Sequence, residues 1–311
     1  MKMKLRALGA AVAAVALAGN ASADAGNWKV PSWRAYLSVP EAVKKVVNGK
    51  CSGHSQGMCV TSNAFFFSFH NQIVKTDWKG RLLKRAEVVP HGGDICHWNG
   101  RVYVGVWEPP AKKGEKGCTA IKVYDAETLE QVKERRMPEW QNAADGITCL
   151  DGVIILAMGM ENWGSDGRSN YFGKFDAETL EPIGKPFVVN HGEPSSCGGQ
   201  NLATDGTYIY ACYYTIDEAA RTPNFIVFDK DFKVVGKHAF GWTHGVDVVP
   251  GGKDGAVRFA WCTTLKNNWD YDSPIVPQLL VQFAEFGPNP LAGGKITDIT
   301  KYIDFKKPMP R

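Results

Sequence analysis

Several common signatures of catalytic and binding sites are missing from the 311-residue chain. There is no Walker-type phosphate loop and no G-x-G-x-x-G motif, so the sequence does not predict nucleotide chemistry. No two of the eight cysteines follow the C-x-x-C spacing that is typical of a structural zinc site. No apolar run approaches about 20 residues, so no membrane-spanning helix is predicted.

A large excess of positive charge is also missing once the N-terminus is set aside. Lys2, Lys4 and Arg6 precede the apolar run 8–18 and the small residues 21–23, which is the pattern of a cleavable signal peptide over residues 1–23. Its removal takes away three positive charges and lowers the formal net charge from +4 to +1. We therefore expect an exported protein, periplasmic or secreted, with no stable membrane anchor and no affinity for nucleic acid.

Cysteines in an exported chain are candidates for disulfide bonds, because the compartment outside the membrane is oxidising. Cys51 and Cys59 flank a short sequence that contains Gly and Ser, and we predict that they pair. The alternative, a reduced thiol in the core, applies to the cysteines in apolar strand-like runs. These are Cys96, Cys149, Cys212 and Cys262.

An internal repeat of about 50 residues organises the chain. The hexapeptide Asp-Ala-Glu-Thr-Leu-Glu occurs at 125–130 and again at 176–181, each time after an aromatic residue, and weaker copies lie at 76–80 and 228–232. Between repeats we expect four short strands separated by turn residues. Four antiparallel strands for each repeat of about 50 residues form a propeller blade, so the sequence predicts an all-β, five-bladed β-propeller over residues 51–303.

The aromatic-Asp-x-x-Thr turns resemble those of quinoprotein-like and YVTN-type repeat propellers. This resemblance lies at the level of the bacterial exported β-propeller superfamily and covers residues 51–303. It implies the architecture and leaves the activity open. Residues 24–50, in which Pro40 begins a short helix, are expected to form an N-terminal cap, and residues 304–311 a C-terminal tail.

The expected loops differ between the two ends of the propeller. The first-to-second and third-to-fourth turns of each blade are short and rich in Gly and Asp, as in tight hairpins. The second-to-third connections are long in four blades, at 108–118, 161–170, 215–224 and 266–277. We expect ligand-binding residues at this loop-rich end, because rigid scaffolds carry their binding residues on such loops.

Polar residues mark the start of each innermost strand at the loop-rich end. We predict that Gln56, Asp94, Asp145, Gln200 and Asp247 hold equivalent positions and converge near the propeller axis. His54, His91 and His244 precede three of them, and His191 and Glu193 precede the fourth unit. Polar groups at such a crowded centre must be hydrogen-bonded or must bind a ligand.

Three interpretations of this ring remain open. It holds water and joins the blades by hydrogen bonds, or it binds Ca²⁺ through Asp94, Asp145 and Asp247, or it is catalytic. Carboxylates held close together acquire different pKa values, which suits acid–base catalysis. Five-bladed propellers that cleave furanosides and fructosides use an inner-strand Asp as base or nucleophile and a Glu as acid, and if the resemblance extends to them it implies Asp94, Asp145 or Asp247 as the base or nucleophile and Glu193, Glu108 or Glu161 as the acid of a glycosidase. For a lyase, His91 or His244 with Tyr213 would be the base and acid.

Aromatic and carboxylate side chains recur together in the long loops and suit the binding of a sugar ring. The expected ligand-binding residues are His54, Gln56, Gln200, Asn201, Trp107, Glu108, Glu161, Trp163, Tyr213, Tyr214 and Trp269. The leading hypothesis is a monomeric, carbohydrate-directed propeller that acts as a glycoside hydrolase or polysaccharide lyase. The alternatives are a Ca²⁺-dependent lactonase or esterase, and a propeller that binds a small molecule, glycan or protein without turnover.

Overall fold

The structure is a computed structural model that describes twelve segments of the chain. These are residues 35–36, 55–88, 91–108, 112, 117–140, 143–159, 167–215, 223–238, 244–250, 255–266, 278–287 and 295–298. The predicted signal peptide, the helix after Pro40 and the C-terminal tail lie outside them. None of the described residues forms a helix of the length and hydropathy needed to cross a membrane.

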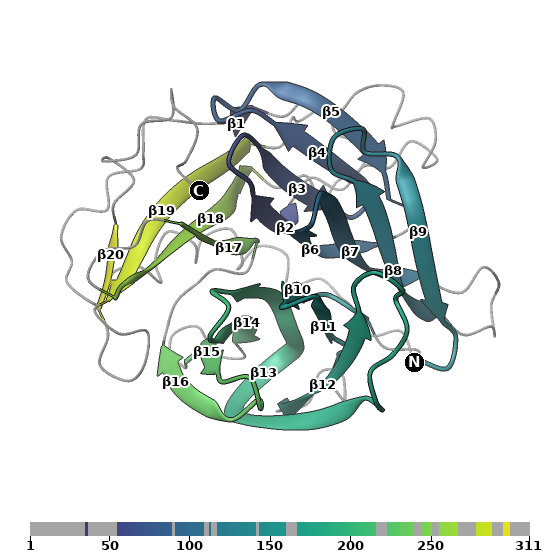
Figure 1. Cartoon of the computed structure of the whole chain (residues 1–311). Coiled ribbons are helices and arrows are strands. Elements are labelled where there is room, and N and C mark those ends of the chain that lie inside the picture. The colour runs from purple at the N-terminus through teal and green to yellow at the C-terminus, as the bar shows by residue number, and fades with distance from the viewer. Residues whose placement is uncertain are drawn as a thin grey trace, which may run out of the picture.

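Antiparallel sheets are arranged radially around a central axis, as Figure 1 shows, with β2, β6, β10 and β17 at the centre. Blade 1 contains β2 (Ser55–Val60), β3 (Phe65–Phe69), β4 (Gln72–Thr76) and β5 (Leu82–Glu87). Blade 2 contains β6 (Gly92–Trp98), β7 (Arg101–Glu108), β8 (Cys118–Asp125) and β9 (Gln131–Met137). Blade 5 contains β17 (Val246–Val249), β18 (Val257–Lys266), β19 (Gln278–Gly287) and β20 (Lys295–Asp298).

Blades 3 and 4 share one long strand. Blade 3 begins with β10 (Ile147–Leu150), β11 (Val153–Ala157) and β12 (Gly167–Asp176), and blade 4 ends with β14 (Ile209–Thr215), β15 (Phe225–Phe228) and β16 (Val234–His238). Between them, β13 (Phe187–Thr204) is the outer strand of blade 3 and then the inner strand of blade 4. Its register with β14 shifts between Ser195 and Gly199 and again before Asn201. These five four-stranded units confirm the predicted five-bladed β-propeller.

The outer edge of β19 in blade 5 is paired with strands from both ends of the chain. β20 pairs with residues 284–287, and the two-residue strand β1 (Ala35–Tyr36) pairs with Gln278 and Leu279. The part of the predicted N-terminal cap that the structure describes is therefore a strand. Pairing of an N-terminal strand beside the last blade brings distant parts of the chain together in one sheet.

Apolar clusters between neighbouring blades form the core. One cluster joins Phe65, Phe67 and Trp78 of blade 1 to Val281 and Phe283 of blade 5. Four further clusters of described residues join blades 1 and 2, 2 and 3, 3 and 4, and 4 and 5. Inner and middle strands such as β3, β4 and β8 are buried along nearly their whole length, because each sheet buries both of its faces against a neighbour.

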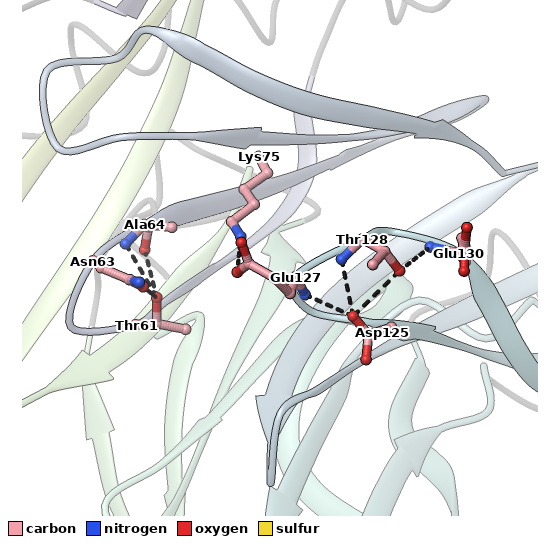
Figure 2. Close-up of polar contacts among 8 residues, drawn as sticks. All are labelled: Thr61, Asn63, Ala64, Lys75, Asp125, Glu127, Thr128 and Glu130. Atoms are coloured by element: carbon pink, nitrogen blue, oxygen red, sulfur yellow. Dashed lines mark hydrogen bonds and ion pairs between the residues drawn. The ribbon is translucent and has the colours of Figure 1, made fainter.

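The tight turns have the predicted chemistry. Figure 2 shows that Asp125 Oδ1 accepts hydrogen bonds from the backbone N–H groups of Glu127 and Thr128, at 3.0 and 2.9 Å. The second copy of the hexapeptide repeats this geometry, since Asp176 Oδ1 accepts from Thr179 N–H at 2.7 Å. In Figure 2, Lys75 of blade 1 also donates to Glu127 of blade 2 at 2.8 Å, so the turn links two blades.

Cysteine thiols fill parts of the core. Cys96, Cys212 and Cys262 are buried free thiols, and Cys149 is a half-buried one, as expected for reduced core residues. Cys59 is also buried. Its predicted disulfide partner, Cys51, lies outside the described residues, so that pairing stays a prediction.

The Asp125 turn predicts a stability difference between two substitutions. Asp125→Ala removes the oxygen that holds two backbone N–H groups and should lower the free energy of unfolding by about 1–2 kcal/mol. Asp125→Asn keeps an acceptor oxygen and should cost clearly less. Urea unfolding of both variants measures the difference, and equal losses would contradict this role of the turn oxygen.

Candidate functional site

Neighbouring inner strands approach each other closely at the axis, and this contact fixes which residues lie at the same height. A methyl group on Gly57 would lie 2.6 Å from the Cα atom of Asp94, and one on Gly93 would lie 2.8 Å from the Cα atom of Asp145. Asp94 is therefore level with Gly57, and Asp145 is level with Gly93. The residues of the predicted ring therefore lie at different positions along the propeller axis, and Asp94 lies one residue farther from the loop-rich end than Asp145.

Asp94 is fully buried, and its carboxylate connects three blades. Its Oδ2 atom accepts hydrogen bonds from the backbone N–H groups of Ile147 in blade 3, at 3.2 Å, and Leu202 in blade 4, at 2.8 Å. Its Oδ1 atom accepts from Asn201 Nδ2 at 3.1 Å. Burial raises the pKa of Asp94 well above its usual value, although these hydrogen bonds act in the opposite direction. With both oxygens engaged, Asp94 has a structural role.

Asp247 also binds backbone groups. Its Oδ2 atom accepts from the N–H of Val60 in blade 1 at 2.8 Å, and its Oδ1 atom accepts from Val248 N–H at 2.9 Å. Burial raises the pKa of Asp247 to about 7, against the effect of these two hydrogen bonds. Val60 ends β2 beside a tight turn, so Asp247 lies deeper along the axis than the loop-rich end.

A chain of polar side chains crosses the axis at the loop-rich end. Gln200 Nε2 donates to Gln56 Oε1 at 2.9 Å, and the Gln56 amide is hydrogen-bonded to His70 Nε2. The rings of His70 and His91 lie 4.2 Å apart. Burial, together with His91, lowers the pKa of His70 well below its usual value, so its ring is neutral. The four side chains come from blades 1, 2 and 4.

Asp145 and His91 lie close together at this end. His91 Nε2 lies 3.9 Å from Asp145 Oδ1, which has no hydrogen-bond partner among the described residues. Burial raises the pKa of Asp145 to about 7 and lowers that of His91. The ring of Trp107 meets the His91 ring edge-on at 6.1 Å. A carboxyl group that titrates near neutral pH, beside a neutral imidazole, can both accept and donate a proton.

Other predicted residues lie near this centre or are engaged elsewhere. His244 is buried, and burial lowers its pKa to about 4. Tyr213 is buried and stacks on His191 at 4.2 Å, while Tyr214 is partly exposed. Asn201 Nδ2 donates to the Gln56 carbonyl at 2.7 Å.

The two described glutamates among the predicted acids are paired with cations. Glu193 binds Lys237 at 2.8 Å. Glu108 lies 2.6 Å from Arg136 and 3.3 Å from Lys122. Burial acts to raise the pKa of Glu108, but its contacts with Cys118, Lys122 and Arg136 leave it below the usual value. Both glutamates are therefore poor candidates for a general acid. The predicted residues His54, Glu161, Trp163 and Trp269 lie outside the described residues.

The predicted calcium ligands do not converge. Among the described residues, no group of three or more His, Cys, Asp or Glu side chains is arranged to hold a metal ion. The carboxylate oxygens of Asp94 and Asp247 accept backbone or side-chain N–H groups. Of the three predicted ligands, only Asp145 keeps an oxygen without a hydrogen bond among the described residues.

His70 lies in the axial chain of polar side chains but was not predicted from the sequence. It lies in the two-residue turn between β3 and β4 and not at the start of a strand. That short connection, beside four long ones, is the signal that would have placed it over the axis.

Residues 53–57 have the G-x-S-x-G spacing of a nucleophile elbow, but Ser55 lies within a strand and its hydroxyl donates to Gly57 O and Ser68 O.

No protein-family model and no curated protein matches the chain. Among solved structures it is similar to Bacteroides ovatus Xyloglucan PUL GH43B, with a TM-score of 0.50 and 14% identity, over 80% of this chain and 55% of that one. Myxococcus xanthus glutaminyl cyclase gives a TM-score of 0.49 and 12% identity, over 79% and 92% of the two chains. A GH43_1 enzyme from Xanthomonas citri gives 0.47 and 11%, over 87% and 96%. At these identities the likeness shows the β-propeller fold alone.

The structural role of Asp94 predicts a large loss of stability on truncation. Asp94→Ala removes the acceptor of two backbone N–H groups and of one Asn201 amide hydrogen bond at the buried axis, and should lower the free energy of unfolding by about 3 kcal/mol or more. Denaturant unfolding followed by tryptophan fluorescence measures this loss. A variant as stable as the wild type would show that the axis does not depend on Asp94.

The raised pKa of Asp145 predicts a pH-dependent stability. Because the folded protein holds this proton up to about pH 7 while the unfolded chain releases it near 3.8, the Asp145 contribution falls as pH rises between these values. Asp145→Asn removes that loss, so the variant should gain stability relative to the wild type from pH 4 to pH 7 and no further above it. Urea unfolding of both proteins at each pH tests this, and a constant difference would contradict the shift.

Proposed function

We propose that the protein is a carbohydrate-directed enzyme in which Asp145 and His91 carry acid–base chemistry. The observation that supports this most is the carboxyl of Asp145, which has a pKa of about 7, keeps one oxygen without a hydrogen bond in the part of the chain that the structure describes, and lies 3.9 Å from His91 Nε2. Proton transfer is most efficient when the catalytic pKa lies near the working pH.

A sugar is the substrate class that suits the surrounding side chains. The indole of Trp107 meets His91, and its Nε1–H has no hydrogen-bond partner among the described residues. Aromatic faces pack on the apolar faces of sugar rings, while N–H and carboxyl groups bind the hydroxyls. The similar propeller of Bacteroides ovatus is named for a xyloglucan locus and as GH43, which makes plant glycans a sensible first choice for a screen.

Of the two carbohydrate reactions, elimination suits the described residues better than hydrolysis, because it does not require a second catalytic carboxyl group. Two-carboxylate hydrolysis requires a second carboxyl facing the first. Asp94 and Asp247 are bound to backbone N–H groups, and Glu193 is bound to Lys237. A lyase requires one base and one acid, which Asp145 and His91 provide, so we favour β-elimination in a uronate-containing glycan.

Binding without turnover is the second candidate, because Trp107 Nε1 beside His91 and Asp145 Oδ1 have no hydrogen-bond partner among the described residues and would be satisfied by a ligand. A Ca²⁺-dependent lactonase or esterase would need the three-carboxylate site that the described residues do not form. The two remaining candidates differ in one measurable respect, which is the effect of Asp145 on turnover.

A screen of uronate-containing and neutral plant glycans tests the proposal. Ultraviolet absorbance of an unsaturated product reports elimination, and new reducing ends without absorbance report hydrolysis. Asp145→Asn and His91→Gln should each lower kcat by about 10²- to 10⁴-fold.

The exposed Asp231→Asn, in the tight turn between β15 and β16, is the matched control and should keep full activity. Glycan binding without turnover, unchanged in Asp145→Asn, would replace the enzyme by a binding protein. Full activity of both site variants would remove Asp145 and His91 from the mechanism.

A further inference from the structure

Two aromatic rings between blades 3 and 4 carry buried polar atoms that have no partner. His191 of β13 and Tyr213 of β14 stack with their ring centroids 4.2 Å apart and their planes at 29°. They are only 1% and 2% exposed. Among the described residues, neither ring nitrogen of His191 has a hydrogen-bond partner, and the Tyr213 hydroxyl has none either. Three hydrogen-bonding atoms are therefore left unsatisfied in one stack.

This arrangement costs stability unless something else satisfies these atoms. Tyr213 belongs to the apolar cluster between blades 3 and 4, together with Ala157, Phe172 and Leu202. A buried hydroxyl without a hydrogen bond costs about 1–3 kcal/mol, and phenylalanine would fill the same space without that cost. The polar atoms thus serve a purpose other than packing.

The stack lies beside the acid–base pair. Gly146, which follows Asp145, donates its N–H to the carbonyl of Gly199 at 3.1 Å. A methyl group on Gly199 would lie 3.6 Å from a ring carbon of Tyr213, so the phenol covers this same contact. Tyr213 therefore packs on Gly199, which binds the residue that follows Asp145, at the junction between blades 3 and 4.

Burial is the main cause of the lowered pKa of His191, and neighbouring positive charges add to it. Burial, with the charges of Lys237 and Arg168, lowers the pKa of His191 to about 4. Lys237 is paired with Glu193, and Arg168 donates to the Gly192 carbonyl at 2.6 Å. At neutral pH the imidazole therefore offers one N–H donor and one lone pair. The Tyr213 hydroxyl adds a group that both donates and accepts.

We infer that His191 and Tyr213 form a subsite for two neighbouring hydroxyls of a sugar ring, next to Asp145 and His91. A pair of hydroxyls supplies both donors and acceptors, which matches a neutral imidazole and a phenol. An anion would satisfy only the donors and leave the imidazole lone pair unpaired. The inference rests on the proposed carbohydrate-directed function and assigns the substrate contact that lies between blades 3 and 4.

Calorimetric titration with four probes tests the subsite: xylotetraose, arabinotetraose, cellotetraose and trigalacturonate. Wild-type protein should bind at least one of them. Tyr213→Phe should weaken that binding about tenfold, which corresponds to one hydrogen bond of about 1.4 kcal/mol. His191→Phe should weaken it at least as much. Because each change removes an unpaired polar group from an apolar junction, neither should lower the Tm.

Tyr210→Phe is the matched control on the same strand. The Tyr210 hydroxyl donates to Asp205 Oδ2 at 2.8 Å, at the tight-turn end of the blade. This variant should lose stability and keep the affinity of the wild type, the reverse of Tyr213→Phe. A loss of Tm without loss of affinity in Tyr213→Phe would assign the phenol a structural role and overturn the inference.

Two further outcomes would also overturn it. One is the absence of binding to all four probes, and the other is a crystal soaked with a bound probe in which only ordered water contacts His191 and Tyr213. The proposed enzymatic function is judged separately by turnover. Binding that depends on Tyr213 without any turnover would support the subsite and contradict the enzymatic function. Turnover with an unchanged KM in Tyr213→Phe would support the enzymatic function and contradict the subsite.

Discussion

The close approach of the inner strands at the propeller axis is the constraint on which the rest of the structure depends. Gly57 has no room for a side chain beside Asp94, and Gly245 has none beside Met58. The carboxylate of Asp94 fits at this level and reaches Leu202 N–H in blade 4, two blades away. A hydrogen-bonded carboxylate thus closes the centre, while apolar clusters between neighbouring blades supply most of the buried surface.

A second set of polar residues lies on the loop-rich side of this closed level. Gln56 is hydrogen-bonded to Gln200 and His70, and the His70 ring lies 4.2 Å from that of His91, which is beside Asp145. Burial keeps both histidines neutral and raises the pKa of Asp145. The axis therefore has a rigid structural level and a polar level with titratable groups, and the second depends on the first for its geometry.

The sequence was sufficient to predict the blades and insufficient to predict the levels at the axis. Asp125 and Asp176 reveal the repeat because an Asx turn needs a carboxylate at a fixed place. Asp94 and Asp145 both begin an inner strand, but the height of a strand depends on contacts with the next blade, which no local pattern encodes. A difference of one residue in position separates Asp94, whose carboxylate oxygens are both hydrogen-bonded, from Asp145, which keeps an oxygen without a hydrogen bond among the described residues. His70 was missed for a related reason, since it reaches the axis from a turn.

The junction between blades 3 and 4 differs from the other described junctions in a way that bears on function. There β13 runs from the outer edge of one blade to the centre of the next, and its register with β14 shifts twice between Ser195 and Asn201. His191 lies on the segment that makes this crossing, and Tyr213 lies opposite its second irregularity. Irregular strand pairing re-aims side chains, and it is common beside active sites. The irregular crossing thus accounts for the entry of two polar rings into an otherwise apolar junction.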